Sequence, residues 1–162
     1  MHGEDDLLVD VTHDKVDNKL PLTLINTNAR SLCPKINSLI DCFGDMEATL
    51  GVVTETWLSD GDGLEEDIEH LALKSGLRLL HRNREDNARG FAHGGVSIVF
   101  KESQCGLKKM RLHNPGKYEV VAATGNLKGS MRKIVVIGCY IPPNYTVGRN
   151  VASDHDLSLI HI

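Results

Sequence analysis

The sequence predicts a fold of the α/β or α+β class, built on a mixed sheet with helices. Two observations support this class. Residues 20–76 alternate strand-like runs with stretches of helical periodicity, whereas residues 76–141 hold five strand-like runs separated by Gly, Asn or charged turns. Because 41% of the 162 residues are apolar, one domain of ordinary size can bury a core.

The first strand is expected at residues 20–28, "LPLTLINTN", with a helix directly after it at 31–43. The strand segment is rich in Leu, Ile and Thr, and Pro21 is tolerable because it stands near the strand start. In "SLCPKINSLIDCF", Pro34 suits an initial helical position. The apolar residues of that segment fall at helical spacing: Leu32, Ile36, Leu39, Ile40 and Phe43.

The second strand is expected at 50–55, "LGVVTE", and the second helix at 61–76, which has acids in its first turn and ends at Gly76. The helix places apolar residues on one face: Leu64, Ile68, Leu71 and Ala72. The five later strands are expected at 76–83, 94–101, 106–113, 117–127 and 132–141.

Both ends of the chain have a different character. Residues 1–18 hold six acids against Lys15 alone and predict a disordered acidic leader. Residues 148–162 show no periodicity and predict an unstructured tail. Its last six residues, "LSLIHI", match the translation of the transposon-end adaptor used in sequencing libraries, which indicates an adaptor-derived end. An ordinary apolar tail is the alternative.

Charge permits a nucleic-acid partner without requiring one. The net charge is -4, but without the leader 16 acidic residues face 17 basic ones. The bases gather at 81–93 and 108–117, and such clusters are most often simply solvated. The four cysteines form no C-x-x-C pair, which favours free thiols. We expect an intracellular protein without a membrane partner, because no apolar run approaches the roughly 20 residues that a bilayer requires.

Three polar residues stand at the ends of predicted strands and are candidates for a site. Glu55 follows the apolar run "LGVV", and a carboxylate beyond a strand end can hold a hard cation such as Mg²⁺. Asn28 can orient a catalytic group or a phosphate, and Tyr140 can donate to a phosphate oxygen. Each also has an ordinary role: a solvated acid, a turn residue and a sheet-edge anchor. We expect the three to converge at one edge of one sheet.

The order and spacing of four motifs, "NARSL", "VVTETWL", "HGGVSIVF" and "CYIPPN", is similar to that of the endonuclease/exonuclease/phosphatase superfamily. The sequence most closely resembles the apurinic-type endonuclease domain of non-LTR retrotransposons. "ETWL" at 55–58 and "YIPP" at 140–143 have the form typical of that branch. The resemblance implies a mixed-sheet sandwich of which about the first half is present, as a partial domain at 20–147.

The resemblance also implies chemistry. Glu55 would hold Mg²⁺ or Mn²⁺, Asn28 would orient the catalytic base, and Tyr140 would bind the phosphate. Five basic residues would meet the DNA backbone: His81, Arg82, Arg84, Arg89 and His93. The parent protein would be a DNA endonuclease that nicks its target to prime reverse transcription, acting in the nucleus with a downstream reverse-transcriptase domain.

The departures from the family pattern define the alternatives. The sequence has no "G-D-F-N" motif, which in the family supplies the base that activates water. "SDH" at 153–155 has the letters of the terminal family motif but follows Tyr140 too closely to match it. We therefore expect this fragment to be inactive alone. The alternatives are a phosphoesterase of the same superfamily acting on inositol lipids, and a non-catalytic remnant or binding module.

Overall fold

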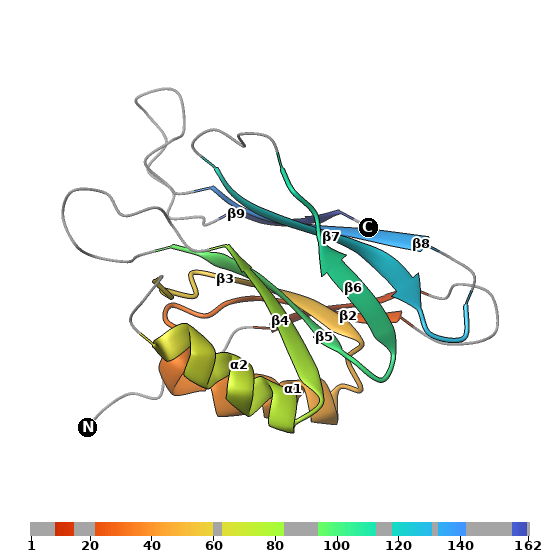
Figure 1. Ribbon diagram of the computed structural model, residues 1–162, viewed down its shortest axis with the longest axis horizontal. Helices are drawn as coiled ribbons and strands as arrows, with labels where there is room; N and C mark the ends of the chain where they lie inside the picture. The colour runs from red at the N-terminus through yellow and green to blue at the C-terminus, as the bar shows by residue number, and fades with distance from the viewer. Residues whose placement is uncertain are drawn as a thin grey trace.

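The computed structural model shows two stacked β-sheets with two helices on the outer face of one of them (Figure 1). It describes residues 9–14, 22–59, 63–82, 94–112, 118–130, 133–141 and 157–161. The first sheet contains β1 (Val9–Asp14), β2 (Leu22–Asn28), β3 (Leu50–Thr54), β4 (Leu77–Arg82) and β5 (Val96–Lys101). The second contains β6 (Cys105–Lys109), β7 (Glu119–Leu127), β8 (Lys133–Ile141) and β9 (Leu157–His161).

The first sheet is mixed and the second is antiparallel. The strand order of the first sheet is β1-β2-β3-β5-β4, with β2 and β3 parallel and the other neighbours antiparallel. The second sheet has the order β6-β7-β8-β9. A short 3-10 helix, η1 (Cys33–Lys35), leads into α1 (Ile36–Asp45), which connects β2 to β3, and α2 (Leu64–Lys74) precedes β4. A mixed α/β (α+β) chain with two sheets is therefore confirmed, whereas the specific superfamily fold stays a prediction.

The first sheet is buried on both faces, which explains the apolar runs of its central strands. Successive side chains of a strand point to opposite faces. Val53 and Val99 accordingly pack against the helices, while Val52 and Ile98 pack against the second sheet. Gly138 in β8 permits this approach, because a Cβ there would lie 2.9 Å from Val52 Cγ1.

The two helices bury one stripe each against this sheet. In α1 the buried residues are Ile36, Leu39 and Phe43, at the spacing of one helical face, and in α2 they are Ile68 and Ala72. Leu64 and Leu71, which the sequence placed on the apolar face of the second helix, are 43% and 40% exposed. The contact face of α2 is therefore narrower than expected.

Both chain ends contribute a strand where the sequence predicted no structure. β1 pairs antiparallel with β2 from Val9↔Thr27 to Asp14↔Leu22, and β9 pairs antiparallel with β8. Strand pairing at an open sheet edge uses backbone N–H and C=O groups, so it does not need the apolar periodicity that the prediction depended on. The remaining residues of the predicted leader and tail, including "SDH" at 153–155, lie outside the described residues.

Candidate active site and metal centre

The carboxyl ends of β2 and β3 lie side by side and carry two of the predicted site residues. Asn28 is the Cα partner of Thr54, the residue before Glu55. Beyond the strands, the Ala29 N–H donates to the Thr54 carbonyl and the Ser31 N–H donates to the Glu55 carbonyl, each at 2.9 Å. These hydrogen bonds place Asn28 and Glu55 at the same end of the sheet, where β2 and β3 finish.

The Asn28 side chain shapes the loop that follows it. Its Oδ1 accepts a hydrogen bond from the Arg30 N–H at 3.1 Å, a local turn that Asn favours. Arg30 and Ser31 have φ of 44° and 83°, in the left-handed region. Asn28 therefore has the ordinary role of a turn residue that the sequence allowed, and the turn fixes the direction of the Asn28 amide.

The backbone that presents Glu55 is strained. Glu55 and Trp57 have φ of 51° and 53°, which is uncommon for residues with a side chain and costs on the order of 1–3 kcal/mol each. Neighbouring backbone holds this loop in place. The Trp57 N–H donates to the Gly94 carbonyl at 2.8 Å, and the Thr56 N–H donates to the Gly95 carbonyl at 3.4 Å. Strain of this kind persists only where the surroundings impose it, and it is concentrated at functional sites.

Tyr140 reaches Glu55 from the other sheet. Its hydroxyl donates to Glu55 Oε1 at 2.5 Å, and the Tyr140 side chain is buried with 4% exposure. The two residues thus converge, but from facing sheets rather than from one edge of a single sheet, as the sequence analysis expected. A strand pattern shows where a strand ends and does not show which sheet it joins.

Glu119 is a buried acid that the sequence analysis did not single out. It is 6% exposed and is the Cα partner of Tyr140 across β7 and β8. Its Oε2 accepts a hydrogen bond from the Gly95 N–H at 2.5 Å, and a Cβ on Gly94 would lie 2.5 Å from its Oε1. Glu119 therefore holds the Gly94–Gly95 backbone that in turn holds the Glu55 loop. An acid at the start of the apolar run "EVVAA" was the available signal.

These contacts define the Glu55 site, which consists of Asn28, Glu55, Glu119 and Tyr140. Burial raises the pKa of the adjacent Cys139 thiol, and the negative charge of Glu119 raises it further. The site is therefore a locally acidic position between two sheets, with a phenol hydroxyl as the donor that reaches Glu55. The Glu55 carboxylate is the group of this site whose chemistry suits a hard divalent cation.

The predicted DNA-contact residues separate into three groups. Arg82 is half-buried. It pairs in register with Val96, which pairs with Thr54, so Arg82 lies at the end of the sheet where Glu55 follows β3. His81 is buried, which does not fit a contact with the DNA backbone. Arg84, Arg89 and His93 lie outside the described residues.

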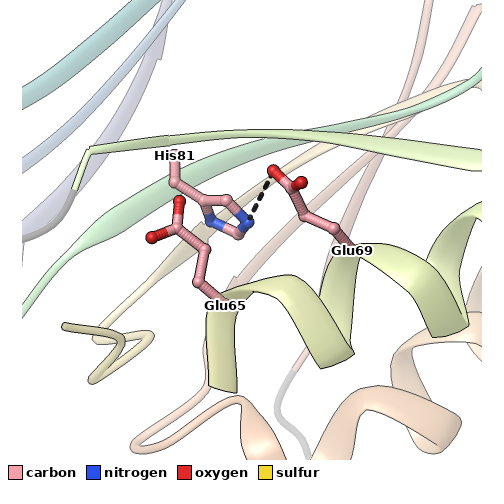
Figure 2. Close-up of side chains that lie close together, drawn as sticks. All are labelled: Glu65, Glu69 and His81. Atoms are coloured by element: carbon pink, nitrogen blue, oxygen red, sulfur yellow. Dashed lines mark ion pairs between the residues drawn. The ribbon is translucent and has the colours of Figure 1, made fainter. Parts of the chain in front are cut away.

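His81 instead takes part in a second constellation, the α2–β4 cluster, formed with Glu65 and Glu69 (Figure 2). One ligand atom from each residue lies within 4.8 Å of the others, so the cluster could hold a metal ion. His81 Nε2 lies 3.8 Å from Glu69 Oε1, and Nδ1 lies 2.5 Å from the Ser97 hydroxyl. Burial lowers the His81 pKa to about 4, with a smaller contribution from Lys109, so the ring is neutral at pH 7.

This cluster is not among the sites predicted from the sequence, where the acids of the second helix indicate only a favourable first turn. Two sequence features could have indicated it. Glu65 and Glu69 are spaced i and i+4 on one helix face, and in "LRLLH" the alternation of a strand places His81 on the same buried face as Leu77 and Leu79.

No protein-family model matches this sequence, and a comparison with curated proteins finds no match. Within the described ranges, neither helix has the length and apolar character needed to cross a bilayer.

Proposed function

We propose that this chain carries part of the active site of a metal-dependent DNA endonuclease, the type found in non-LTR retrotransposons. The observation that carries the proposal is the hydrogen bond from the Tyr140 hydroxyl to Glu55. It unites two residues 85 positions apart that the sequence resemblance assigns to one site. The strained, backbone-supported loop at Glu55 is what a positioned carboxylate needs.

The residues fit a magnesium ion. Mg²⁺ is commonly held by one or two carboxylates together with substrate phosphates, so a single carboxylate at a strand end is a sufficient protein contribution. Glu55 would be that ligand, with Mn²⁺ as the substitute ion. When bound there, the ion would polarise the scissile phosphate and stabilise the leaving oxygen.

The remaining residues of the site have separate tasks. The Tyr140 hydroxyl donates to the Glu55 carboxylate and so orients it, and the same hydroxyl would bind a phosphate oxygen beside Glu55. The Asn28 amide, whose Oδ1 is fixed by the Arg30 N–H, would orient the catalytic base. Arg82, at the same sheet edge, would contact the DNA backbone.

Nicking of supercoiled plasmid tests the proposal. Because the sequence has no "G-D-F-N" motif, the chain is joined to the C-terminal half of an endonuclease domain of this superfamily. We expect Mg²⁺-dependent nicking of duplex DNA and no release of phosphate from inositol phosphates. Phosphate release without nicking would favour the inositol-lipid phosphoesterase. Absence of both activities, from a folded chimera, would favour the non-catalytic remnant.

A further inference from the structure

The α2–β4 cluster lies away from the Glu55 site, where α2 packs on the edge strand β4. Glu65 and Glu69 stand one turn apart, on the side of α2 that also carries the buried Ile68 and Ala72. His81 follows Leu77 and Leu79 on the face of β4 that packs against this helix. The fold thus directs two carboxylates and one imidazole toward the same point (Figure 2).

The imidazole is the decisive member of this group. The His81 side chain is 2% exposed, and within the described part of the chain its Nε2 has no hydrogen-bond partner. A buried polar nitrogen without a partner costs roughly 1–3 kcal/mol, so it calls for an explanation. This atom faces the Glu69 carboxylate, and the Glu65 carboxylate lies beside the same ring (Figure 2).

The two carboxylates add to the case. Like charges at i and i+4 on a helix repel each other. Here both acids belong to a group that also includes the buried His81 ring. Lys109 also contacts this strand, where its Nζ donates to the His81 carbonyl. A cation between the three side chains would give the His81 nitrogen a partner and would reduce the repulsion between the two acids.

We propose that Glu65, Glu69 and His81 form a binding site for a divalent transition metal of the Zn²⁺ type, which ties α2 to β4. The proposal is independent of the nuclease proposal, because it uses none of the residues of the Glu55 site.

The geometry requires only a small closure. Ligand atoms around tetrahedral Zn²⁺ lie roughly 3.3 Å apart, since each stands about 2.0 Å from the metal. The present separations reach up to 4.8 Å, and the His81–Glu69 pair is already at 3.8 Å. Glu69 is 52% exposed at its side chain and can move inward without disturbing the core. Glu69 also lines a groove of about 330 Å³ between α2 and β4, so this ligand is accessible from outside.

The donor set selects the class of metal. Mg²⁺ and Ca²⁺ prefer oxygen ligands, whereas an imidazole nitrogen favours Zn²⁺ and its neighbours in the transition series. The Ser97 hydroxyl, 2.5 Å from Nδ1, fixes the ring in the way that outer partners orient ligating histidines. Three protein ligands leave the fourth tetrahedral position for water or another exchangeable ligand.

Zn²⁺ titration of the full 162-residue chain tests the site, with Co²⁺ absorption as a report of tetrahedral coordination. We expect one tight equivalent of Zn²⁺, a higher melting temperature, and weaker binding of Mg²⁺ and Ca²⁺. The double substitution Glu65→Gln/Glu69→Gln, at half-buried and exposed positions, should lower the Zn²⁺ affinity roughly 100-fold or more. His81→Gln should do the same if it folds, and the double substitution decides the matter if it does not.

Two matched controls separate binding at this cluster from metal binding elsewhere on the chain. Glu66→Gln and His70→Gln alter exposed residues of the same helix and should leave the Zn²⁺ affinity unchanged. Glu55→Gln should also leave it unchanged, so loss of the nuclease proposal would not affect this result. Equal Zn²⁺ binding by the double variant and the unaltered chain would assign the metal to another place, such as the cysteines, and would overturn the proposal. Absence of Zn²⁺ binding by the unaltered chain would overturn it as well.

Discussion

The Glu55 site and the α2–β4 cluster are positioned in opposite ways. The Glu55 site is assembled from strand ends and loops of two sheets, through left-handed backbone at Glu55 and Trp57. The cluster is assembled from one regular helix and the strand that follows it. The first offers oxygen atoms and the second includes an imidazole nitrogen. The two proposed metal sites therefore differ in their support: the Glu55 site depends on the stacking of the two sheets, and the cluster depends on a local helix–strand unit.

The largest effect is expected where the Glu55 loop depends on its backbone support. Gly94→Ala would place a Cβ 2.5 Å from Glu119 Oε1 at a residue with φ of 106°. Left-handed strain and overpacking together should lower the free energy of unfolding by about 3 kcal/mol, measured by urea denaturation. Gly44→Ala in α1 is the control, because nothing lies within 4 Å of its Cβ. It should be neutral or stabilising by up to about 1 kcal/mol. Equal losses in both variants would show that Gly94 is an ordinary position.

Glu55→Gln should have the largest effect on chemistry. The substitution keeps the shape of the side chain and removes its charge, so the nicking rate of the joined domain should fall roughly 100-fold or more, about 2.7 kcal/mol. Glu102→Gln is the matched control, since Glu102 is exposed at the opposite end of β5. Full nicking by the Glu55→Gln variant at saturating Mg²⁺ would remove Glu55 from the mechanism.

The α2–β4 cluster should show itself in the pH dependence of stability when metal is removed with a chelator. The folded-state pKa of His81 is lowered from 6.5 to about 4, so the unfolded chain binds a proton first as pH falls. Stability should therefore decrease from about pH 6.5 to about pH 4, by roughly 3 kcal/mol in total, and His81 should contribute no further change below that range. The exposed His70 provides the control: His70→Gln should retain the full decrease, whereas His81→Gln should lose this part of it. Identical curves for both variants would contradict the burial of the ring.

The smallest effect is expected for DNA binding. Arg82→Ala should weaken binding by the joined domain and reduce the slope of log affinity against log salt by about 1, because one phosphate contact is lost. Arg78 stands on the same strand, in line with Phe100 and Leu50 at the far end of the sheet. Arg78→Ala should leave the slope unchanged. The same slope change in both variants would indicate a general charge effect.

Much of the fold could be predicted because its central elements have strong local signals. The apolar runs at β3 and β5 and the helical spacing of Leu39 and Phe43 are fixed by burial on known faces. The strands β1 and β9 could not be predicted from periodicity. They pair through backbone groups at sheet edges, where side-chain pattern matters least.

The strand-end residues of the Glu55 site could be predicted from the sequence, but the residues that hold them in place could not. Glu55 and Tyr140 stand out because polar groups follow or end apolar strands, but the contact between them depends on the stacking of two sheets. Glu119 accepts a hydrogen bond from the Gly95 N–H and so holds the backbone beside the Glu55 loop. Its place next to Tyr140 depends on the register of β7 and β8, which the sequence pattern does not show. His81 was assigned to a basic surface cluster because its neighbours in sequence are charged, whereas the alternation of β4 turns it inward.

Paramagnetic broadening by Mn²⁺ tests most directly whether Glu55 holds a metal ion beside Tyr140. The measurement uses the Glu65→Gln/Glu69→Gln variant, which removes the competing carboxylates of the α2–β4 cluster. We expect Mn²⁺ to broaden the ring resonances of Tyr140 before the methyl resonances of Ile134, at the other end of β8, and we expect Glu55→Gln to abolish the difference. Equal broadening of the two residues, or selective broadening that survives Glu55→Gln, would contradict the account.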